Sequence, residues 1–257
     1  MRVVECLSPN GAAGLDPAVR DDLLDLAIFC ADLQARLATP AGKSAARRQA
    51  IELLDQAEAL FGPSPVLDEE RKLHGGSSPA RIPQSRPRTA WEHYAWGRSL
   101  LRAGMLDGAA KVLEQAVRLE PQGLWPNFYH GLCAYRLGRH TDAVAAYSVC
   151  IGAAPEAASC FHNRALCFEA LDRPEQALRE YDQALRLDPT LADAALNRGV
   201  LHYRAKRYDA AIADLQRAKE LGSDPAVVAF DLLLVNLSRG QYSTAFDDFR
   251  RVLGSRH

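Results

Sequence analysis

Residues 124–157, LWPNFYHGLCAYRLGRHTDAVAAYSVCIGAAPEA, and residues 158–191, ASCFHNRALCFEALDRPEQALREYDQALRLDPTL, follow one shared pattern. The pattern is about 34 residues long and runs from residue 90 to residue 257 without a change of spacing. It predicts five helix–turn–helix repeats, at 90–123, 124–157, 158–191, 192–225 and 226–257. A key column is small in four repeats and large in the fifth: Gly97, Gly131, Ala165, Gly199, Leu233.

Three further columns recur at the same step. The first is always alanine: Ala109, Ala143, Ala177, Ala211, Ala245. The second is large: Leu113, Tyr147, Tyr181, Leu215, Phe249. The third is small in most repeats: Ala116, Cys150, Ala184, Ala218, Val252. Small residues that face large ones allow two helices to approach closely and fill the space between them. A glycine or polar residue is expected at the turn: Gly104, Gly138, Asp172, Lys206, Gly240.

A last column is proline in three repeats, at Pro121, Pro155 and Pro189, and Ser223 in the fourth. This period, with its small, aromatic and late proline columns, resembles the tetratricopeptide repeat (TPR). The resemblance covers about two thirds of the chain and implies an all-α TPR solenoid, a right-handed superhelix of stacked helix pairs. Each pair buries its apolar face only against its neighbours, so stability is a sum over repeats. The fold class makes a binding role more expected than a catalytic one.

The first 74 residues are expected to form a separate helical segment. Asp16 and Pro17 open one helix that reaches Leu37, and a second runs from about Ser44 to Phe61. Ala50, Leu54 and Ala57 repeat the small–large–small spacing of a second TPR helix, so this pair reads as a degenerate repeat. A short helix is expected from Pro65 to Leu73.

Residues 75–89, GGSSPARIPQSRPRT, form the clearest linker because they are rich in proline, glycine and arginine. Thr89 and Glu92 then make the T-x-x-E spacing of a capping box at the start of the first repeat. At the other end, the last repeat has no separate polar capping helix. Four of its large apolar residues are expected to form an apolar edge: Phe246, Phe249, Val252, Leu253.

Bulk composition is that of an ordinary globular protein, with 48% hydrophobic and 25% charged residues and a net charge of −1. Near-neutral charge argues against nucleic-acid and anionic-membrane partners. No apolar run approaches the ~20 residues needed to cross a bilayer, and the N-terminus does not read as an export signal. The six cysteines form no C-x-x-C pair, so free thiols and a cytoplasmic location are expected.

No motif supports catalysis, and neither a cofactor nor a metal is expected. The sequence lacks G-x-S-x-G, H-E-x-x-H and a P-loop lysine. His162 lies near Cys160 and Cys167, but their helical offsets do not put all three on one face. A pairing of Cys133 with Cys167, which share a column, is a remote alternative to inert buried thiols. The chain is therefore not expected to be an enzyme.

A ligand is expected on the first helices of the repeats, which line the concave face of a TPR superhelix. Trp, Tyr and Arg are enriched among residues that dominate binding energy, and Asn can pair with a peptide backbone. The alternative for each residue is packing between repeats or a surface ion pair. The candidate groove residues are Trp91, Tyr94, Arg98, Arg102, Trp125, Phe128, Tyr129, Tyr135, Arg136, Asn163, Asn197, Tyr203 and Arg204.

Some TPR proteins hold the C-terminal carboxylates of chaperones with a clamp of lysines, asparagines and an arginine. The resemblance keeps only the asparagine column, at Asn163 and Asn197. The lysine columns hold Phe128 and His162, or else Asp193 and Val227. The sequence therefore disfavours a chaperone-tail adaptor.

A narrower resemblance links four segments to the C-terminal helical and TPR region of large bacterial serine/threonine protein kinases. They are DLLDLAIFCADLQARL (22–37), ALFGPSPVLDEER (59–71), TAWEHYAWGRSLLRAG (89–104) and PQGLWPNFYHGLCAYRLGR (121–139). The resemblance reaches from about Leu15 to the C-terminus. It implies a docking module, because the chain itself has no Gly-rich loop, H-R-D or D-F-G motif.

Three functions follow from these observations. The first is a protein-interaction scaffold that binds an extended peptide or a partner helix in the concave groove. The second is a detached regulatory module that works with a serine/threonine kinase. The third is an RNA-binding helical repeat protein, against which the near-neutral charge argues. The sequence leaves the partner and the oligomeric state open.

Overall fold

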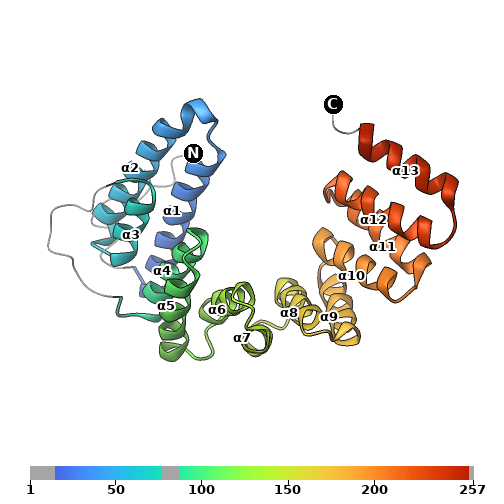
Figure 1. Cartoon of the computed structure of the whole chain (residues 1–257). Helices are drawn as coiled ribbons and strands as arrows, with labels where there is room; N and C mark the ends of the chain where they lie inside the picture. Colours follow the sequence, from blue (N-terminus) through green and yellow to red (C-terminus); the bar gives the residue numbers. More distant parts are fainter. Residues whose placement is uncertain (1–14, 77–86, 255–257) are drawn as a thin grey trace. The chain divides into compact units, whose positions relative to one another are not determined.

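The computed structural model describes residues 15–76 and 87–254. The chain divides into two compact units, Met1–Cys133 and Ala134–His257. The described part is entirely helical, as the repeat pattern predicted, and Figure 1 shows its helices as successive hairpins. The first unit holds α1 (Pro17–Leu37), the short 3-10 helix η3 (Pro40–Gly42), α2 (Lys43–Phe61), α3 (Pro65–Leu73), α4 (Ala90–Arg102), α5 (Leu106–Leu119) and most of α6 (Leu124–Arg136).

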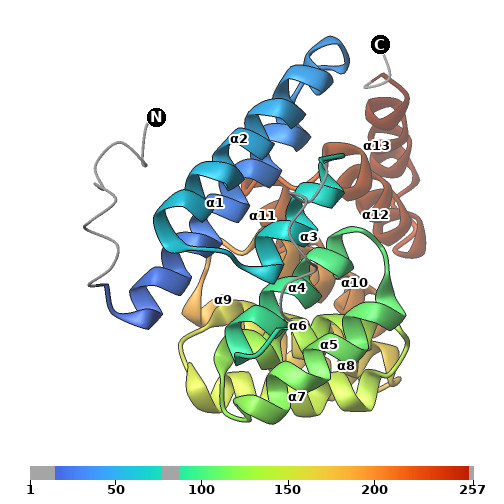
Figure 2. The same ribbon diagram turned by 90° about the vertical axis from the view of Figure 1, so that its left-hand side faces the viewer.

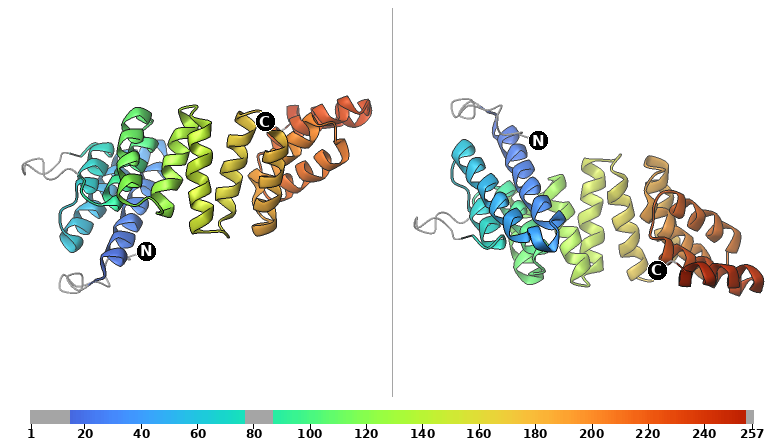
Figure 3. Two further views of the ribbon diagram at one scale, coloured as in Figure 1. Left: turned by 90° about the horizontal axis from the view of Figure 1, so that it is seen from below. Right: turned by 90° about the horizontal axis from the view of Figure 1, so that it is seen from above.

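The second unit continues with α7 (His140–Ala153), α8 (Ala158–Ala170), α9 (Pro174–Leu187), α10 (Ala192–Arg204), α11 (Tyr208–Glu220), α12 (Pro225–Ser238) and α13 (Tyr242–Gly254). Pairs such as α8 with α9 and α10 with α11 form antiparallel hairpins that lie side by side, from yellow to red in Figure 3. Each of these two hairpins falls within one repeat of the sequence, residues 158–191 and 192–225.

The repeat columns form the core. The alanine, large and small columns are buried wherever the structure describes their side chains. The side chains of Tyr147 and Tyr181, for example, are at most 1% exposed. In the last repeat Ala245 is buried and Phe246 is 55% exposed. The expectations for Phe249, Val252 and Leu253 concern side chains outside the described part.

The turn between paired helices uses one left-handed residue at the predicted column. Gly104, Gly138 and Gly240 have φ near +75°, a region open to glycine at no steric cost. Asp172 and Lys206 occupy the same column with φ of 55° and 59°. A non-glycine residue in this region carries a small conformational cost, so the two exceptions show that the turn shape is imposed by the hairpin.

The N-terminal helices are packed onto the first repeat and share its core. α1 and α2 form an antiparallel pair with α3 next to them, seen in Figure 2. Leu24, Ile28, Leu54 and Leu67 cluster with Ala95 of α4. The three residues predicted to mimic a second repeat helix, at positions 50, 54 and 57, are all buried. This segment is thus a helical hairpin that packs against α4.

α3 is fixed by a buried arginine. The Arg71 side chain is 2% exposed and donates to Asp55 of α2 at 2.8 Å, to Asp68 of its own helix at 3.0 Å and to Glu58 of α2. A buried guanidinium is tolerated only when carboxylates surround it in this way. The predicted capping box also forms: Thr89 accepts from the Glu92 amide, and the Glu92 carboxylate accepts from the Thr89 amide. Of the predicted linker 75–89, residues 77–86 lie outside the described residues.

Candidate protein-binding surface

Two of the predicted groove residues, Tyr94 and Arg98, face the chain's own α1. The Arg98 guanidinium donates to both carboxylate oxygens of Asp25, at 2.9 and 3.2 Å, and the Tyr94 hydroxyl donates to the same carboxylate. Burial raises the pKa of Asp25 even though Arg98 acts to lower it. The forked arginine–carboxylate contact expected for a bound segment therefore exists here within the chain.

Arg102, one turn further along α4, is also engaged. Its guanidinium lies 3.2 Å from Asp32 of α1 and also contacts Glu70 of α3. Glu70 is 1% exposed and accepts a second hydrogen bond from the Ser99 hydroxyl. These contacts compensate the burial of its charge. The two arginines of α4 are thus paired by the N-terminal helices.

The sequence reasoning missed these acidic partners, although a signal existed. Asp25 and Asp32 are seven residues apart, which places both on the same side of α1. Arg98 and Arg102 are four residues apart on one side of α4. Two carboxylates on one helix can pair with two guanidiniums on another. Recognising this match in the sequence requires knowing that α1 packs beside α4.

Aromatic side chains form a cluster between α4 and α6. The rings of Tyr94 and Tyr129 stack with centroids 5.8 Å apart, and Phe128 meets Tyr129 edge-on at 5.6 Å. Arg98 lies over both tyrosine rings, at 5.5 and 5.9 Å. Trp125 packs at the rim of this cluster, 6.1 Å from Phe128, and remains 52% exposed. We call Trp125, Phe128 and Tyr129 the α6 aromatic face.

The other aromatic candidates are more enclosed. Trp91 is half-buried and packs against the core of the first unit. In the second unit Tyr135 is half-buried with its ring 5.3 Å from His140, and burial raises the pKa of its hydroxyl. Arg136, the next residue, is exposed. Both Trp91 and Tyr135 are thus half-buried and contact neighbouring side chains of their own unit.

In the second unit, Tyr181 joins the first helices of repeats three and four. Its hydroxyl donates to Glu169 of α8 at 2.5 Å and is also hydrogen-bonded to Asn197 of α10. Arg204 of α10 reaches the same Glu169 at 3.5 Å while its side chain stays 66% exposed. Burial, together with the Glu169 hydrogen bond, raises the pKa of the Tyr181 hydroxyl. Glu169 thus binds Arg204 and the Tyr181 hydroxyl, and that hydroxyl in turn contacts Asn197.

Tyr203 and Asn163 complete the candidate set. The Tyr203 hydroxyl lies 3.3 Å from the Ser238 hydroxyl of α12, and its ring is 6.4 Å from Tyr208. Asn163 is half-buried on α8. On α12, Val227 is 45% and Phe230 is 53% exposed. The second unit therefore presents polar side chains on α8 and α10 and exposed apolar ones on α12.

The cysteines of the described chain are free and largely buried. Cys133 and Cys167 each direct their thiol at a backbone carbonyl, Leu106 and Asn163 respectively. Burial raises the pKa of the Cys167 thiol to about 12. A hydrogen bond to Cys160, with burial, raises the pKa of Cys150. These thiols behave as small core residues.

No group of three or more His, Cys, Asp or Glu side chains in residues 15–76 and 87–254 is arranged to hold a metal ion. Among the helices of the same residues, none combines the length and the apolar character that a bilayer span requires.

Solved structures with the same fold include PilF of Pseudomonas aeruginosa, with a TM-score of 0.64, 17% identity, and coverage of 92% of this chain and 93% of PilF. MamA matches with a TM-score of 0.59 and 16% identity over 64% of this chain and 90% of MamA. YrrB matches with a TM-score of 0.56 and 14% identity over 65% of this chain and 86% of YrrB. At such identities the likeness shows the fold alone. No curated protein sequence matches the chain.

The family comparison agrees with the repeat columns. The model of the family described as "Tetratricopeptide repeat" matches residues 94–158 and 163–226, which together make up half of the chain. The matched ranges cover the helices that carry the buried alanine, large and small columns of the first four repeats. The chain therefore belongs to the tetratricopeptide repeat family.

Proposed function

We propose that this chain is a protein-interaction scaffold that binds an extended peptide or a partner helix along the first helices of its repeats. TPR proteins generally act as non-enzymatic scaffolds. One observation carries the proposal: first helices keep large aromatic side chains in solvent, with Trp125 52% and Phe230 53% exposed. Core aromatics such as Tyr147 are fully enclosed, whereas these two keep about half of their side chains in solvent. YrrB, which shares the fold, is a TPR protein with an unusual peptide-binding site.

The structure narrows the expected contact residues. Tyr94, Arg98 and Arg102 already bind carboxylates of α1 and α3, so a ligand would have to displace those contacts to use them. Within the α6 aromatic face, Trp125 makes no comparable contact with a carboxylate of α1 or α3. A ligand of the first unit is therefore expected to contact α6 more than α4.

The second unit supplies groups of a different kind. Asn163 and Asn197 stand in the same repeat column, and amide side chains both donate to and accept from a peptide backbone. The largely exposed Arg204 can take a carboxylate of the ligand in addition to Glu169. Phe230 adds an apolar contact on α12. This combination suits a peptide that offers its main chain, an acidic residue and an apolar residue.

The test uses peptides selected by display against the full chain, with their affinities then measured by calorimetry. We expect Trp125→Ala and Phe230→Ala to weaken binding of selected peptides by about tenfold or more each, since exposed aromatic anchors dominate such interfaces. The matched control is Leu119→Ala on α5, a second helix, because Leu119 is equally exposed at 54%. Its affinity should equal that of the wild type.

Two results would contradict the proposal. One is unchanged affinity in both aromatic variants. The other is an equal loss in Leu119→Ala, which would mean that binding does not depend on the first helices. Melting curves of each variant separate a loss of binding from a loss of fold. The affinities of Arg136→Ala and Tyr129→Ala, measured in the same assay, show how far the peptide-binding surface extends along α6.

The kinase-associated docking role is the more specific version of this proposal. It is supported by the four sequence segments that resemble kinase C-terminal regions, two of which include α1 and α4. It predicts that a serine/threonine kinase co-purifies with the wild-type chain and is lost with Trp125→Ala. Recovery of other partners without any kinase would leave the scaffold role and remove the kinase role.

A further inference from the structure

α1 is apolar on two opposite sides. One side carries Leu24, Ile28 and Ala31, which are at most 2% exposed and pack in the core of the first unit. The other side exposes five large apolar residues, which we call the α1 stripe: Val19 at 45%, Leu26 at 43%, Phe29 at 57%, Leu33 at 40% and Leu37 at 76%. A helix that is apolar on both sides is normally covered on both.

The stripe is continuous along the helix. Its members follow one another by three, four or seven residues, the spacing that stacks side chains on one face. From Val19 to Leu37 it extends about 27 Å at about 1.5 Å per residue. It faces away from the core side of α1, where α2 and α3 pack, and the acidic contacts to α4 lie to one flank. Within the first unit each of its five members stays at least 40% exposed.

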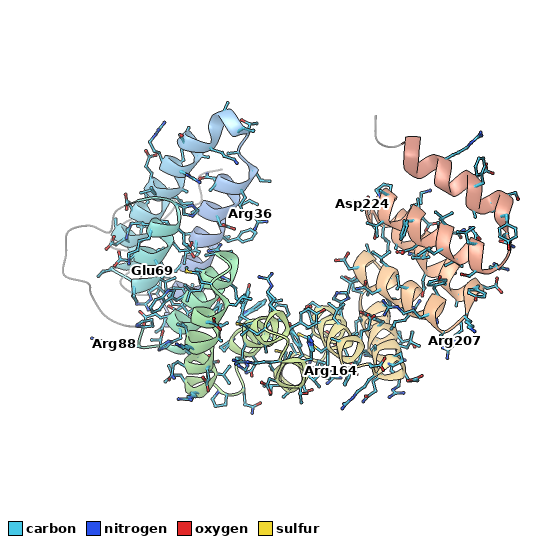
Figure 4. The ribbon with its side chains drawn as sticks, viewed as in Figure 1. Arg36, Glu69, Arg88, Arg164, Arg207 and Asp224 are labelled. Atoms are coloured by element: carbon cyan, nitrogen blue, oxygen red, sulfur yellow. The ribbon has the colours of Figure 1, made fainter. Side chains whose placement is uncertain are left out.

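The charges beside the stripe repeat with a simple symmetry. Asp22 and Arg36 lie within about 20° of Phe29 around the helix, one seven residues before it and the other seven residues after it. Asp22 is exposed, and the Arg36 side chain is 71% exposed and directed away from the hairpin partner α2 (Figure 4). If two α1 helices run antiparallel with Phe29 at their two-fold axis, the acid of each meets the arginine of the other. Such reciprocal contacts define an isologous interface.

We propose that two copies of this chain pair through the α1 stripe, antiparallel about Phe29, with Asp22 of each copy against Arg36 of the other. The within-chain contact of Arg36, to Asp32 at 3.4 Å, is exposed on the arginine side and therefore weak. Arg36 can exchange it for Asp22 of the second copy, which leaves Asp32 to Arg102. The stripe supplies the apolar centre, and the charges fix direction and register.

The second copy fits the stripe better than an unrelated partner does. A self-complementary face needs its apolar and charged groups arranged symmetrically about one point, and Phe29 is that point. A partner of different sequence would need no such arrangement. An isologous pair also closes at two copies, whereas stacking of one end of the solenoid on the other end of the next chain would continue into a filament.

The first test measures molar mass by light scattering over a concentration series of the full chain. We expect a species of twice the 28.2 kDa chain mass, and its loss in Phe29→Glu. The control is Leu119→Glu, which places the same charge on an equally exposed leucine of α5 and should leave the dimer intact. A wild-type monomer at every concentration, open-ended assemblies, or a dimer that Phe29→Glu does not weaken would overturn the proposal.

The second test addresses register. Asp22→Arg and Arg36→Asp should each weaken the dimer, because like charges then meet at both ends of the pair. Mixing the two single variants should restore a dimer with one chain of each, and the double variant should dimerise with itself. The dissociation constant of the mixed dimer, measured by sedimentation equilibrium, should be at least tenfold lower than that of either single variant alone. No recovery in either case overturns the antiparallel pairing about Phe29.

The outcome is separable from peptide binding. The substituted residues lie on α1 and do not touch the α6 aromatic face or Phe230. Affinity for display-selected peptides should therefore be the same in Asp22→Arg and wild type, whichever way the mass measurement turns out. The matched control for the effect of charge alone exchanges an exposed ion pair on α5, with Glu114→Arg and Arg118→Glu in one chain.

Discussion

At the scale of single residues, one repeat column shows how a methyl group decides packing. Gly97 and Gly199 occupy the same place in two repeats, and Ala165 fills it in a third. A Cβ at Gly97 would lie 2.4 Å from Leu113 Cγ, whereas one at Gly199 would lie 3.1 Å from Leu215 Cγ. The first contact requires movement of the leucine, but the second requires only a small shift.

We therefore expect Gly97→Ala to destabilise the first unit by about 1–3 kcal/mol through overpacking. Gly199→Ala should be close to neutral, because the better helix preference of alanine, about 1 kcal/mol, offsets the milder contact. Urea unfolding followed by circular dichroism measures both. Equal effects of the two substitutions would show that Leu113 has room to move.

At the scale of elements, arginines tie the two helices of a repeat together. Arg164 of α8, labelled in Figure 4, binds both oxygens of Glu180 on α9. Arg198 of α10 does the same to Asp214 on α11, at 2.8 and 2.6 Å. Arg198 also donates to Asp182 on the second helix of the preceding repeat. Each arginine therefore orients its own hairpin and contacts the one before it.

A double-mutant cycle on Arg198 and Asp214 is expected to give a coupling free energy of about 1 kcal/mol, since both side chains are mostly buried and the contact is forked. The comparison pair is Arg118 with Glu114 on α5, both more than half exposed. Its coupling should stay near 0.3 kcal/mol. Couplings of equal size would mean that the forked pair contributes no more than a surface pair.

At the scale of the whole molecule, buried and half-buried histidines make stability depend on pH. Burial lowers the pKa of His74, His93, His162 and His202 below the ordinary 6.5. The unfolded chain therefore binds more protons than the folded one as pH falls through 6.5, and the free energy of unfolding decreases. The full contribution of the neutral rings is present above pH 6.5.

We expect a lower urea midpoint at pH 5.5 than at pH 7.5, and a smaller difference in His162→Gln. Asp21, Asp25 and Asp231 act in the opposite direction at lower pH, because burial raises their pKa above 3.8 and the folded chain then holds the extra proton. The histidine effect should therefore level off in more acidic buffer. A midpoint that does not change between the two pH values contradicts the expected sign.

The sequence predicted most of the fold because the repeat supplies several aligned observations of each position. Ala143, Tyr147 and Cys150 were assigned to the core by their columns, and all are buried. The partners of Tyr94 and Arg98 were not predictable in this way, because α1 lies outside the repeat period and its contact with α4 is specific to this chain. The contribution of the candidate residues to binding remains a prediction that only the ligand assays address.

Because α1 and α3 pack on α4, the choice of boundaries for a truncated fragment matters. The family match begins at residue 94, inside α4, yet the carboxylates that neutralise Arg98 and Arg102 come from residues 25, 32 and 70. A fragment trimmed to the recognisable repeats would expose two arginines and the apolar surface around Ala95. Such a fragment would attract acidic proteins through a surface that the intact chain keeps covered, so interaction screens with it would report false partners.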